Sequence, residues 1–198
     1  TDPTSCSRRS VPEVLEGKRP HFESLNERKR DDTIVDVLPA PWNARTRVHE
    51  YGGGAWWAAD GVAYYSEFGD QRLRRIEPGS EPVLLTAEPA VPRGLRYADG
   101  RPTPDGEWYV CVHERHGDGE PVNEIVAVAT DGSMRTEVIA SGADFYAAPR
   151  LSPDGRSVVW IQWMHPNMPW DSTELWIADL DGASVRNARK LVGNSDEA

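Results

Sequence analysis

Apolar residues along the chain gather in short runs separated by polar turns, as in VAYYSEF, WYVCVHE, EIVAVAT, SVVWIQW and ELWIADL. None of these runs sustains the i, i+3, i+4 spacing of an amphipathic helix over a dozen positions. Their β-branched and aromatic content favours strands, and the Asp-Gly and Pro-Asp-Gly sequences between them are typical of tight turns. The pattern predicts an all-β protein.

The strand pattern also repeats. Asp60-Gly61, Asp105-Gly106 and Asp154-Gly155 each precede an aromatic or β-branched run, and they recur at about 45 to 50 residues, the period of a four-stranded propeller blade. A sandwich would not explain the threefold recurrence. We therefore expect a β-propeller with about three four-stranded blades plus a partial blade.

This period also predicts the domain boundaries. Residues 1–34 are expected to form an irregular leader and a degenerate first-blade segment, and residues 35–198 a partial β-propeller domain. Its blades fall roughly at 54–88, 93–142 and 145–194. Because propellers close with roughly four to eight blades, we expect an incomplete ring. The chain is then a fragment of a larger propeller, or a subunit that self-associates through its open blade edges.

The composition of the chain indicates which binding partners and which cellular compartment to expect. The chain has 22 Lys and Arg against 32 Asp and Glu, a formal net charge of -10. This charge argues against binding nucleic acid or an anionic membrane surface. No apolar run reaches the roughly 18 residues that a membrane helix needs, and the start lacks a signal peptide's apolar segment, so a cytoplasmic location is expected. Cys6 and Cys111 lie far apart without metal-type spacing, so we expect no disulfide framework.

The glycine run in HEYGGGAWW has a structural interpretation. Gly52 to Gly54 stand where the innermost strand of the first complete blade is expected to begin, and backbones crowd one another near a propeller channel. A phosphate-binding loop would need a following helix, but Trp56-Trp57 follows instead. The G-x-S-x-G motif of a nucleophile elbow is absent from the sequence.

Two loops carry chemically interesting side chains. HERHGDGEPVN, residues His113 to Asn123, is expected to be a solvated loop, with a polar contact surface or a metal site as alternatives. Its histidines lack the H-E-x-x-H spacing. WMHPNMPWD, residues Trp163 to Asp171, holds large apolar groups that favour burial under the ring or against another domain, with a ligand-facing role as the alternative.

Several motifs together resemble one family. RTRVHEYGGGAW, DQRLRR, LRYADG, NEIVAV, DFYAAPRLSPDG and HPNMPWDSTELWIADL are similar to the N-terminal propeller of the prolyl oligopeptidase family of serine peptidases, in its dipeptidyl aminopeptidase and acylaminoacyl peptidase-like branch. The resemblance runs from about Val35 to Val192. HEYGGG followed by HPNMPWD is its most specific part.

The resemblance implies a propeller that covers a separate C-terminal α/β-hydrolase domain, which contributes the Ser, Asp and His of the catalytic triad. The propeller would gate access and select short peptide substrates, as in aminopeptidases or acylaminoacyl peptidases. No catalytic residue can be assigned to this chain, which is expected to be inactive alone, and no metal or cofactor is expected.

Two other functions remain open at this point. One is a non-catalytic, TolB-like propeller scaffold for protein-protein interaction through exposed strand edges. The other is a propeller enzyme with its own metal-assisted site on the channel loops.

Loop placement and motif match together select the residues expected to face substrate or the catalytic domain. An acid among them, Glu50 or Glu114, could bind a peptide α-amino group through a charge-assisted hydrogen bond. The candidates are His49, Glu50, Tyr51, Glu114, Arg115, Trp163, His165, Asn167, Trp170 and Asp171.

Overall fold

The computed structural model describes residues 26–28 and 34–193, and within them it contains strands and no helix. Three four-stranded antiparallel sheets follow one another along the chain, each in sequential strand order. The first comprises β3 (Trp56–Ala59), β4 (Val62–Ser66), β5 (Leu73–Ile76) and β6 (Val83–Leu84). The second comprises β7 (Leu95–Pro102), β8 (Trp108–Arg115), β9 (Val122–Ala129) and β10 (Thr136–Ala140). The third comprises β11 (Phe145–Leu151), β12 (Ser157–Trp163), β13 (Glu174–Asp181) and β14 (Ser184–Val192).

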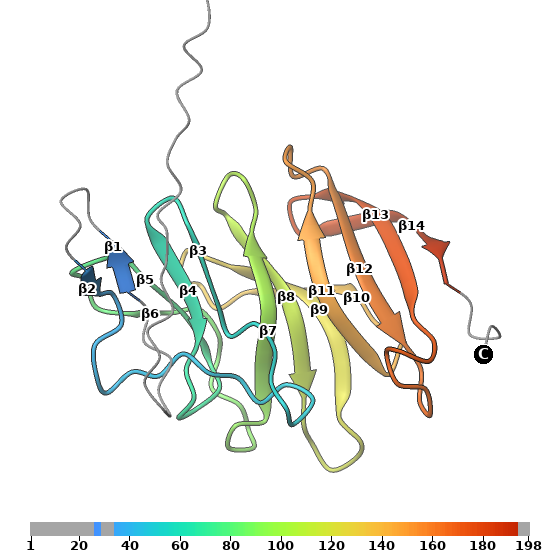
Figure 1. The fold of residues 1–198 in the computed structure, drawn as a ribbon, viewed down its shortest axis with the longest axis horizontal. Helices are drawn as coiled ribbons and strands as arrows, with labels where there is room; N and C mark the ends of the chain where they lie inside the picture. The colour runs from blue at the N-terminus through green and yellow to red at the C-terminus, as the bar shows by residue number, and fades with distance from the viewer. Residues whose placement is uncertain (1–25, 29–33, 194–198) are drawn as a thin grey trace, which may run out of the picture.

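These sheets are three blades of an open propeller, which confirms the predicted fold class (Figure 1). A short pair, β1 (Asn26–Arg28) with β2 (Ile34–Asp36), precedes them. The predicted leader, residues 1–34, lies outside the described residues except for β1 and the first residue of β2. The described part of the chain contains no helix long and apolar enough to cross a membrane.

Apolar layers fill the spaces between blades. Tyr109 and Cys111 of β8 pack toward the first blade, while Val110 and Val112 pack toward the third. Both faces of β8 are therefore buried, which explains its nearly continuous apolar sequence. Full burial of each such side chain contributes roughly 1.5–3 kcal/mol before opposing entropy is counted.

Inner strands β3, β7 and β11 lie next to one another in that order, and Asp99 of β7 bonds to the segment just before β3 and to β11. Its Oδ1 accepts from the Gly54 backbone N–H at 2.6 Å, and its Oδ2 accepts from the Ala148 N–H at 3.3 Å. A Cβ on Gly54 would lie 2.8 Å from Asp99 Oδ1, and one on Gly53 would lie 3.1 Å from the Ala98 Cβ. This close approach confirms the structural interpretation of the glycine run.

The same irregularity recurs in the inner strands of the second and third blades. The register of β7 with β8 shifts between Ala98 and Arg101, and that of β11 with β12 shifts between Ala147 and Arg150. Each shift is a β-bulge, which bends the strand and re-aims the side chains beyond it. Arg101 and Arg150 therefore hold equivalent positions in consecutive blades.

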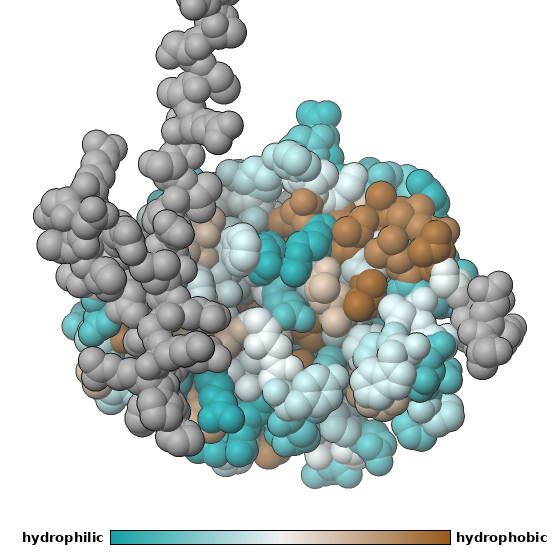
Figure 2. Space-filling view, viewed as in Figure 1, coloured by the Kyte–Doolittle hydropathy of each residue, from teal (hydrophilic) through white to brown (hydrophobic). Residues whose placement is uncertain are grey.

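The last blade has an open side. Figure 2 shows hydrophobic side chains gathered over this blade, near the C-terminal end of the described chain. Leu191 and Val192 of the outermost strand, β14, are 40% and 63% exposed. The third blade thus offers an apolar surface of the kind that faces a neighbouring blade elsewhere in the molecule.

Candidate functional site

Strand direction brings all ten predicted residues to one end of the blades. The β3–β4, β7–β8 and β11–β12 hairpin turns lie together at one end, the upper edge in Figure 1. Residues before β3, at the end of β8 and after β12 lie at the other end, since neighbouring strands are antiparallel. We call this second end the loop face. The predicted residues that it carries are His49, Glu50, Tyr51, Glu114, Arg115, Trp163, His165, Asn167, Trp170 and Asp171.

Glu114 is the centre of a hydrogen-bond cluster on this face. It belongs to β8, is only 3% exposed, and stands directly opposite Arg96 of β7. Its Oε1 accepts from Arg96 Nη1 at 2.9 Å and lies 2.6 Å from His116 Nε2, while Oε2 accepts from the His49 backbone N–H at 2.7 Å. Both carboxylate oxygens are engaged, so Glu114 positions its neighbours and is not free to bind a ligand amine.

The expectation of a solvated loop from His113 to Asn123 is therefore wrong at both ends of that stretch. His113, Glu114 and Asn123 are buried. His113 lies 3.3 Å from Glu124 and stacks on Tyr97, with ring centroids 4.9 Å apart. His113 and Glu114 belong to β8 and Asn123 to β9, and all three are buried because blades pack on both faces of this sheet.

A strained turn presents Glu50 at the surface. His49 and Glu50 both have positive φ, 53° and 65°, and each such conformation costs a non-glycine residue roughly 1–2 kcal/mol. The turn is held by Glu50 N–H donating to the Arg47 carbonyl at 2.9 Å, and by the His49 N–H bond to Glu114. Backbone strain of this kind persists only where surrounding contacts fix it, and it is concentrated at functional sites.

Glu50 itself has the more accessible carboxylate. Its side chain is 71% exposed, and its Oε1 accepts from Arg96 Nη1 at 2.6 Å. The hydrogen bond and positive charge of Arg96 lower the pKa of Glu50 below its ordinary value. The carboxylate is therefore ionised at neutral pH, and no donor other than Arg96 holds it among the described residues.

Aromatic rings surround the side chain of His49, the residue before Glu50 in the turn. The His49 ring lies edge-on to Phe145 and Trp163, at centroid distances of 5.3 and 6.0 Å, and tilted to Tyr51 at 5.8 Å. Phe145 and Trp163 stack on each other at 5.2 Å. Burial lowers the pKa of His49, with partial compensation from the nearby charge of Glu114. The imidazole is therefore uncharged at neutral pH. We call the rings of His49, Tyr51, Phe145 and Trp163 the aromatic wall; its most exposed ring is Tyr51, at 72%.

The 164–173 loop follows Trp163 on the same face. It is tied down by the His165 N–H, which donates to Asp144 Oδ2 at 2.8 Å, and by the Met168 N–H, which donates to Asp171 Oδ2 at 3.0 Å. Trp163 is buried, as expected, whereas Met164, Met168 and Trp170 remain exposed, Trp170 at 76%. The loop therefore presents a fixed apolar surface.

Only some of the predicted site residues contact one another in the structure. His49, Glu50, Tyr51, Glu114 and Trp163 form one connected cluster. His165, Asn167, Trp170 and Asp171 belong to the adjoining loop. Arg115 is an exposed residue at the end of β8, and its side chain makes no hydrogen bond or ion pair within the described chain.

The prediction missed Arg96, His116 and Phe145. Arg96 is 9% exposed and connects Glu50 with Glu114. Its place in the LRYADG motif was visible, but its partner depends on the β7 bulge. Phe145 is the second residue of the DFYAAPRLSPDG motif, and only the fold reveals its contact with His49.

Glu50, Glu114 and His116 offer ligand atoms within 4.8 Å of one another, the spacing of a metal site. However, Arg96 Nη1 donates to both carboxylates from between them. A guanidinium already supplies the positive charge, so the geometry fits an ion-pair network and does not fit a bound metal ion.

Comparisons with known proteins give a match among solved structures. No protein-family model and no curated protein matches the chain. A puromycin-hydrolyzing peptidase from Mycobacterium tuberculosis matches 87% of the chain at 38% identity, with a TM-score of 0.79. A puromycin hydrolase matches the same share at 35% identity, with a TM-score of 0.78. The chain spans 29% of the length of each of these two proteins. TolB from Acinetobacter baumannii, at 13% identity over 89% of the chain and 42% of its own, has a TM-score of 0.53 and shares the fold alone.

Proposed function

The chain is a β-propeller segment of the prolyl oligopeptidase family of serine peptidases, and on that premise we propose that its loop face selects short peptide substrates for a hydrolase domain. The observation that carries the proposal is the exposed, ionised Glu50 carboxylate on the same turn as His49, whose ring belongs to the aromatic wall. The sequence of this chain contains no motif that indicates a serine nucleophile, its base or an oxyanion hole. The catalytic step is therefore assigned to a C-terminal α/β-hydrolase domain of the complete gene product.

Glu50 would recognise the free α-amino group of the substrate. An ammonium group can donate a charge-assisted hydrogen bond to the carboxylate oxygen that Arg96 leaves available. Glu114, with both oxygens occupied, would fix the turn that carries Glu50. Arg96 would hold the carboxylate in place and keep it ionised.

The aromatic wall would receive the side chain next to that amino group. His49, Phe145 and Trp163 form a contiguous ring cluster, and aromatic rings pack favourably edge-to-face or offset. Both similar peptidases are named after puromycin, which is an amide of an aromatic amino acid with a free α-amino group. Substrates of this chemical class fit both elements of the proposed site.

The 164–173 loop would meet the hydrolase domain. Trp170 is exposed at the tip of an otherwise well-fixed loop, and large exposed aromatic side chains are enriched in interfaces. Contact there would bring the peptide-binding cluster close to the catalytic serine.

The experiment is a peptidase assay of the complete native gene product. Reporters would be alanyl and phenylalanyl p-nitroanilides with free amino groups, and the same compounds acetylated at nitrogen. We expect serine-inhibitor-sensitive cleavage with a higher kcat/KM for the free-amino phenylalanyl compound. Absence of any serine-dependent cleavage would refute the proposal, whereas equal rates on acetylated and free compounds would refute the role of Glu50.

A second function is favoured by one observation, the apolar open side of the third blade. Leu191 and Val192 on β14 would suit association with another protein in a TolB-like scaffold, or with a second copy of this chain. The reading frame distinguishes the two functions. An in-frame G-x-S-x-G within an α/β pattern downstream supports the peptidase, and a stop codon after Ala198 supports the scaffold.

A further inference from the structure

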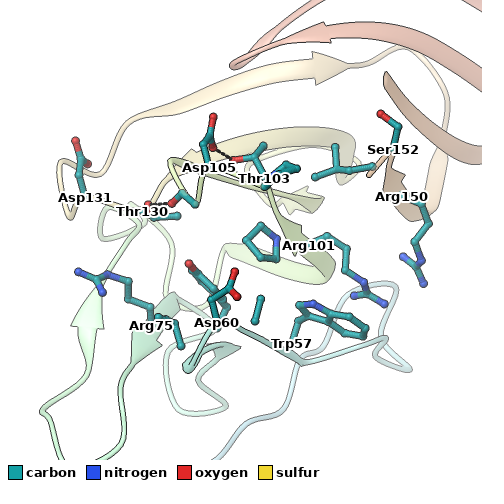
Figure 3. A pocket seen from close by; sticks show the side chains of 17 residues that line it. Trp57, Asp60, Arg75, Arg101, Thr103, Asp105, Thr130, Asp131, Arg150 and Ser152 are labelled. Carbon is teal, nitrogen blue, oxygen red and sulfur yellow. Dashed lines mark hydrogen bonds between the residues drawn. The ribbon is translucent and has the colours of Figure 1, made fainter. Parts of the chain in front are cut away.

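A cavity of about 790 Å³ lies at the hairpin end of the blades, away from the loop face. The turns β3–β4, β7–β8 and β11–β12 surround it (Figure 3). It thus lies beside the channel-lining strands of three consecutive blades. The substrate-selecting role of the loop face makes no use of this cavity.

Two arginines from equivalent positions line one side of the cavity. Arg101 and Arg150 each follow the bulge of their inner strand, which aims both side chains toward the same space. The Cζ atom of the Arg101 guanidinium lies over the Trp57 ring, 3.4 Å from its centroid. Figure 3 shows Arg101, Arg150 and Trp57 together, with Asp131 on the far side of the cavity.

Neither guanidinium has a carboxylate partner in the described part of the chain. The hydrogen bonds they make within it are to backbone oxygens, from Arg101 Nη1 to Gly100 at 2.6 Å and from Arg150 Nη1 to Pro149 at 2.8 Å. Burial and, after it, the positive charge of Arg150 lower the pKa of Arg101. The charge of Asp99 acts on Arg101 in the opposite direction, but its carboxylate forms no ion pair with either arginine. Two neighbouring cations without a carboxylate in direct contact are unexpected in a chain whose net charge is -10.

We propose that Arg101 and Arg150 bind the C-terminal carboxylate of a short peptide, whose last side chain packs along Trp57. Guanidinium groups offer paired donors that match the two oxygens of a carboxylate. Asp60, Asp105 and Asp131 also line the cavity and disfavour a polyanion such as a nucleotide or polyphosphate. That the carboxylate belongs to a peptide rests on the proposed function. That the cavity binds a carboxylate rests only on the residues that line it.

The test is isothermal titration calorimetry on the complete native gene product, inactivated beforehand with a serine-directed inhibitor. N-acetyl-alanyl-alanine, its C-terminal amide, acetate and inorganic phosphate are the probes. The acetyl group removes the amine that Glu50 would recognise, so the titration reports on the cavity alone. Variants are Arg101→Gln, Arg101→Lys and Arg150→Gln, with Arg156→Gln as a matched control because Arg156 is exposed on the same hairpin outside the cavity.

We expect the free acid to bind at least about tenfold more tightly than the amide, since a charge-assisted pair is lost. Arg101→Gln and Arg150→Gln should each weaken binding about tenfold, Arg101→Lys should also weaken it through loss of the paired donors, and Arg156→Gln should not. Acetate should compete weakly. Arg150 is exposed, so its variant keeps the test valid even if Arg101→Gln disturbs packing on Trp57.

Equal binding of acid and amide, or unchanged binding in both glutamine variants, would overturn the site. Phosphate binding more tightly than the peptide acid would overturn the carboxylate assignment. Peptidase activity of the uninhibited protein tests the proposed function separately. The reporter for it has a free amino group and no carboxylate. Absence of this activity together with retained carboxylate binding would refute the peptidase role and leave the cavity as an anion site.

Discussion

Replacing Glu114 with Gln should loosen the turn that presents Glu50. The carboxylate accepts hydrogen bonds at both oxygens, with Arg96 and His116 at Oε1 and the His49 N–H at Oε2. A glutamine amide has one accepting oxygen and one donating nitrogen. If the oxygen stays with Arg96, the amide nitrogen faces the His49 N–H, and that donor loses its partner.

The magnitude follows from the type of bond. A hydrogen bond to a charged group contributes about 1.5–3 kcal/mol, and the bond concerned is 2.7 Å long to a residue only 3% exposed. The turn already carries two residues with positive φ, so it has little stability of its own to offset the loss. Local opening should become easier by that amount, which accelerates amide exchange roughly ten- to hundredfold.

Hydrogen-deuterium exchange with mass spectrometry on the complete gene product measures this directly. Peptides covering residues 45–52 should exchange faster in Glu114→Gln, while those covering β12 stay unchanged. Glu120→Gln, an exposed acid on the β8–β9 loop, is the control. Unchanged exchange at His49 in the Glu114 variant would refute the positioning role of Glu114.

Two further predictions concern the stability of the blades. Gly54→Ala should lower the free energy of unfolding by about 1–3 kcal/mol, because its Cβ would lie 2.8 Å from Asp99 Oδ1; Gly117→Ala, with open space around its Cβ, is the control in thermal denaturation. Burial lowers the pKa of His113 in the folded state, so between that value and 6.5 the unfolded chain binds more protons and stability falls as pH decreases. Calorimetry from about pH 8 to pH 5 should show a shallower fall in His113→Gln than in the unchanged protein, and equal slopes would contradict this account.

The sequence was sufficient to predict the three blades because each blade repeats the same order of turns and apolar runs. The Asp-Gly turns at residues 60, 105 and 154 stand at one end of each first hairpin, which fixes strand direction and hence the loop face. The glycine run was also interpretable, since the need for close backbone approach depends on its position at the start of an inner strand.

Side-chain partners on the loop face were not predictable for a specific reason. The β7 bulge inserts one residue between Ala98 and Arg101. Without it Tyr97, not Arg96, would stand opposite Glu114, and the link to Glu50 would not exist. A bulge changes which side chain faces the partner strand without changing the apolar pattern from which strands are recognised.

The sequence also did not reveal which of Glu50 and Glu114 is accessible. Both looked like available acids in the sequence, and only the three contacts of Glu114 separate a positioning residue from an accessible one. The arginine pair in the cavity was equally hidden, because Arg101 and Arg150 are 49 positions apart along the printed chain and meet only through the matching bulges of consecutive blades.

The ratio of kcat/KM for free-amino to N-acetylated phenylalanyl p-nitroanilide, measured in the complete gene product and in Glu50→Gln, tests the central claim most directly. Loss of the charged bond should lower the rate constant on the free-amino reporter by about tenfold or more and leave the acetylated reporter unaffected. Glu120→Gln should leave both rate constants unchanged. An unaltered ratio in Glu50→Gln would contradict the claim that this propeller face selects the substrate.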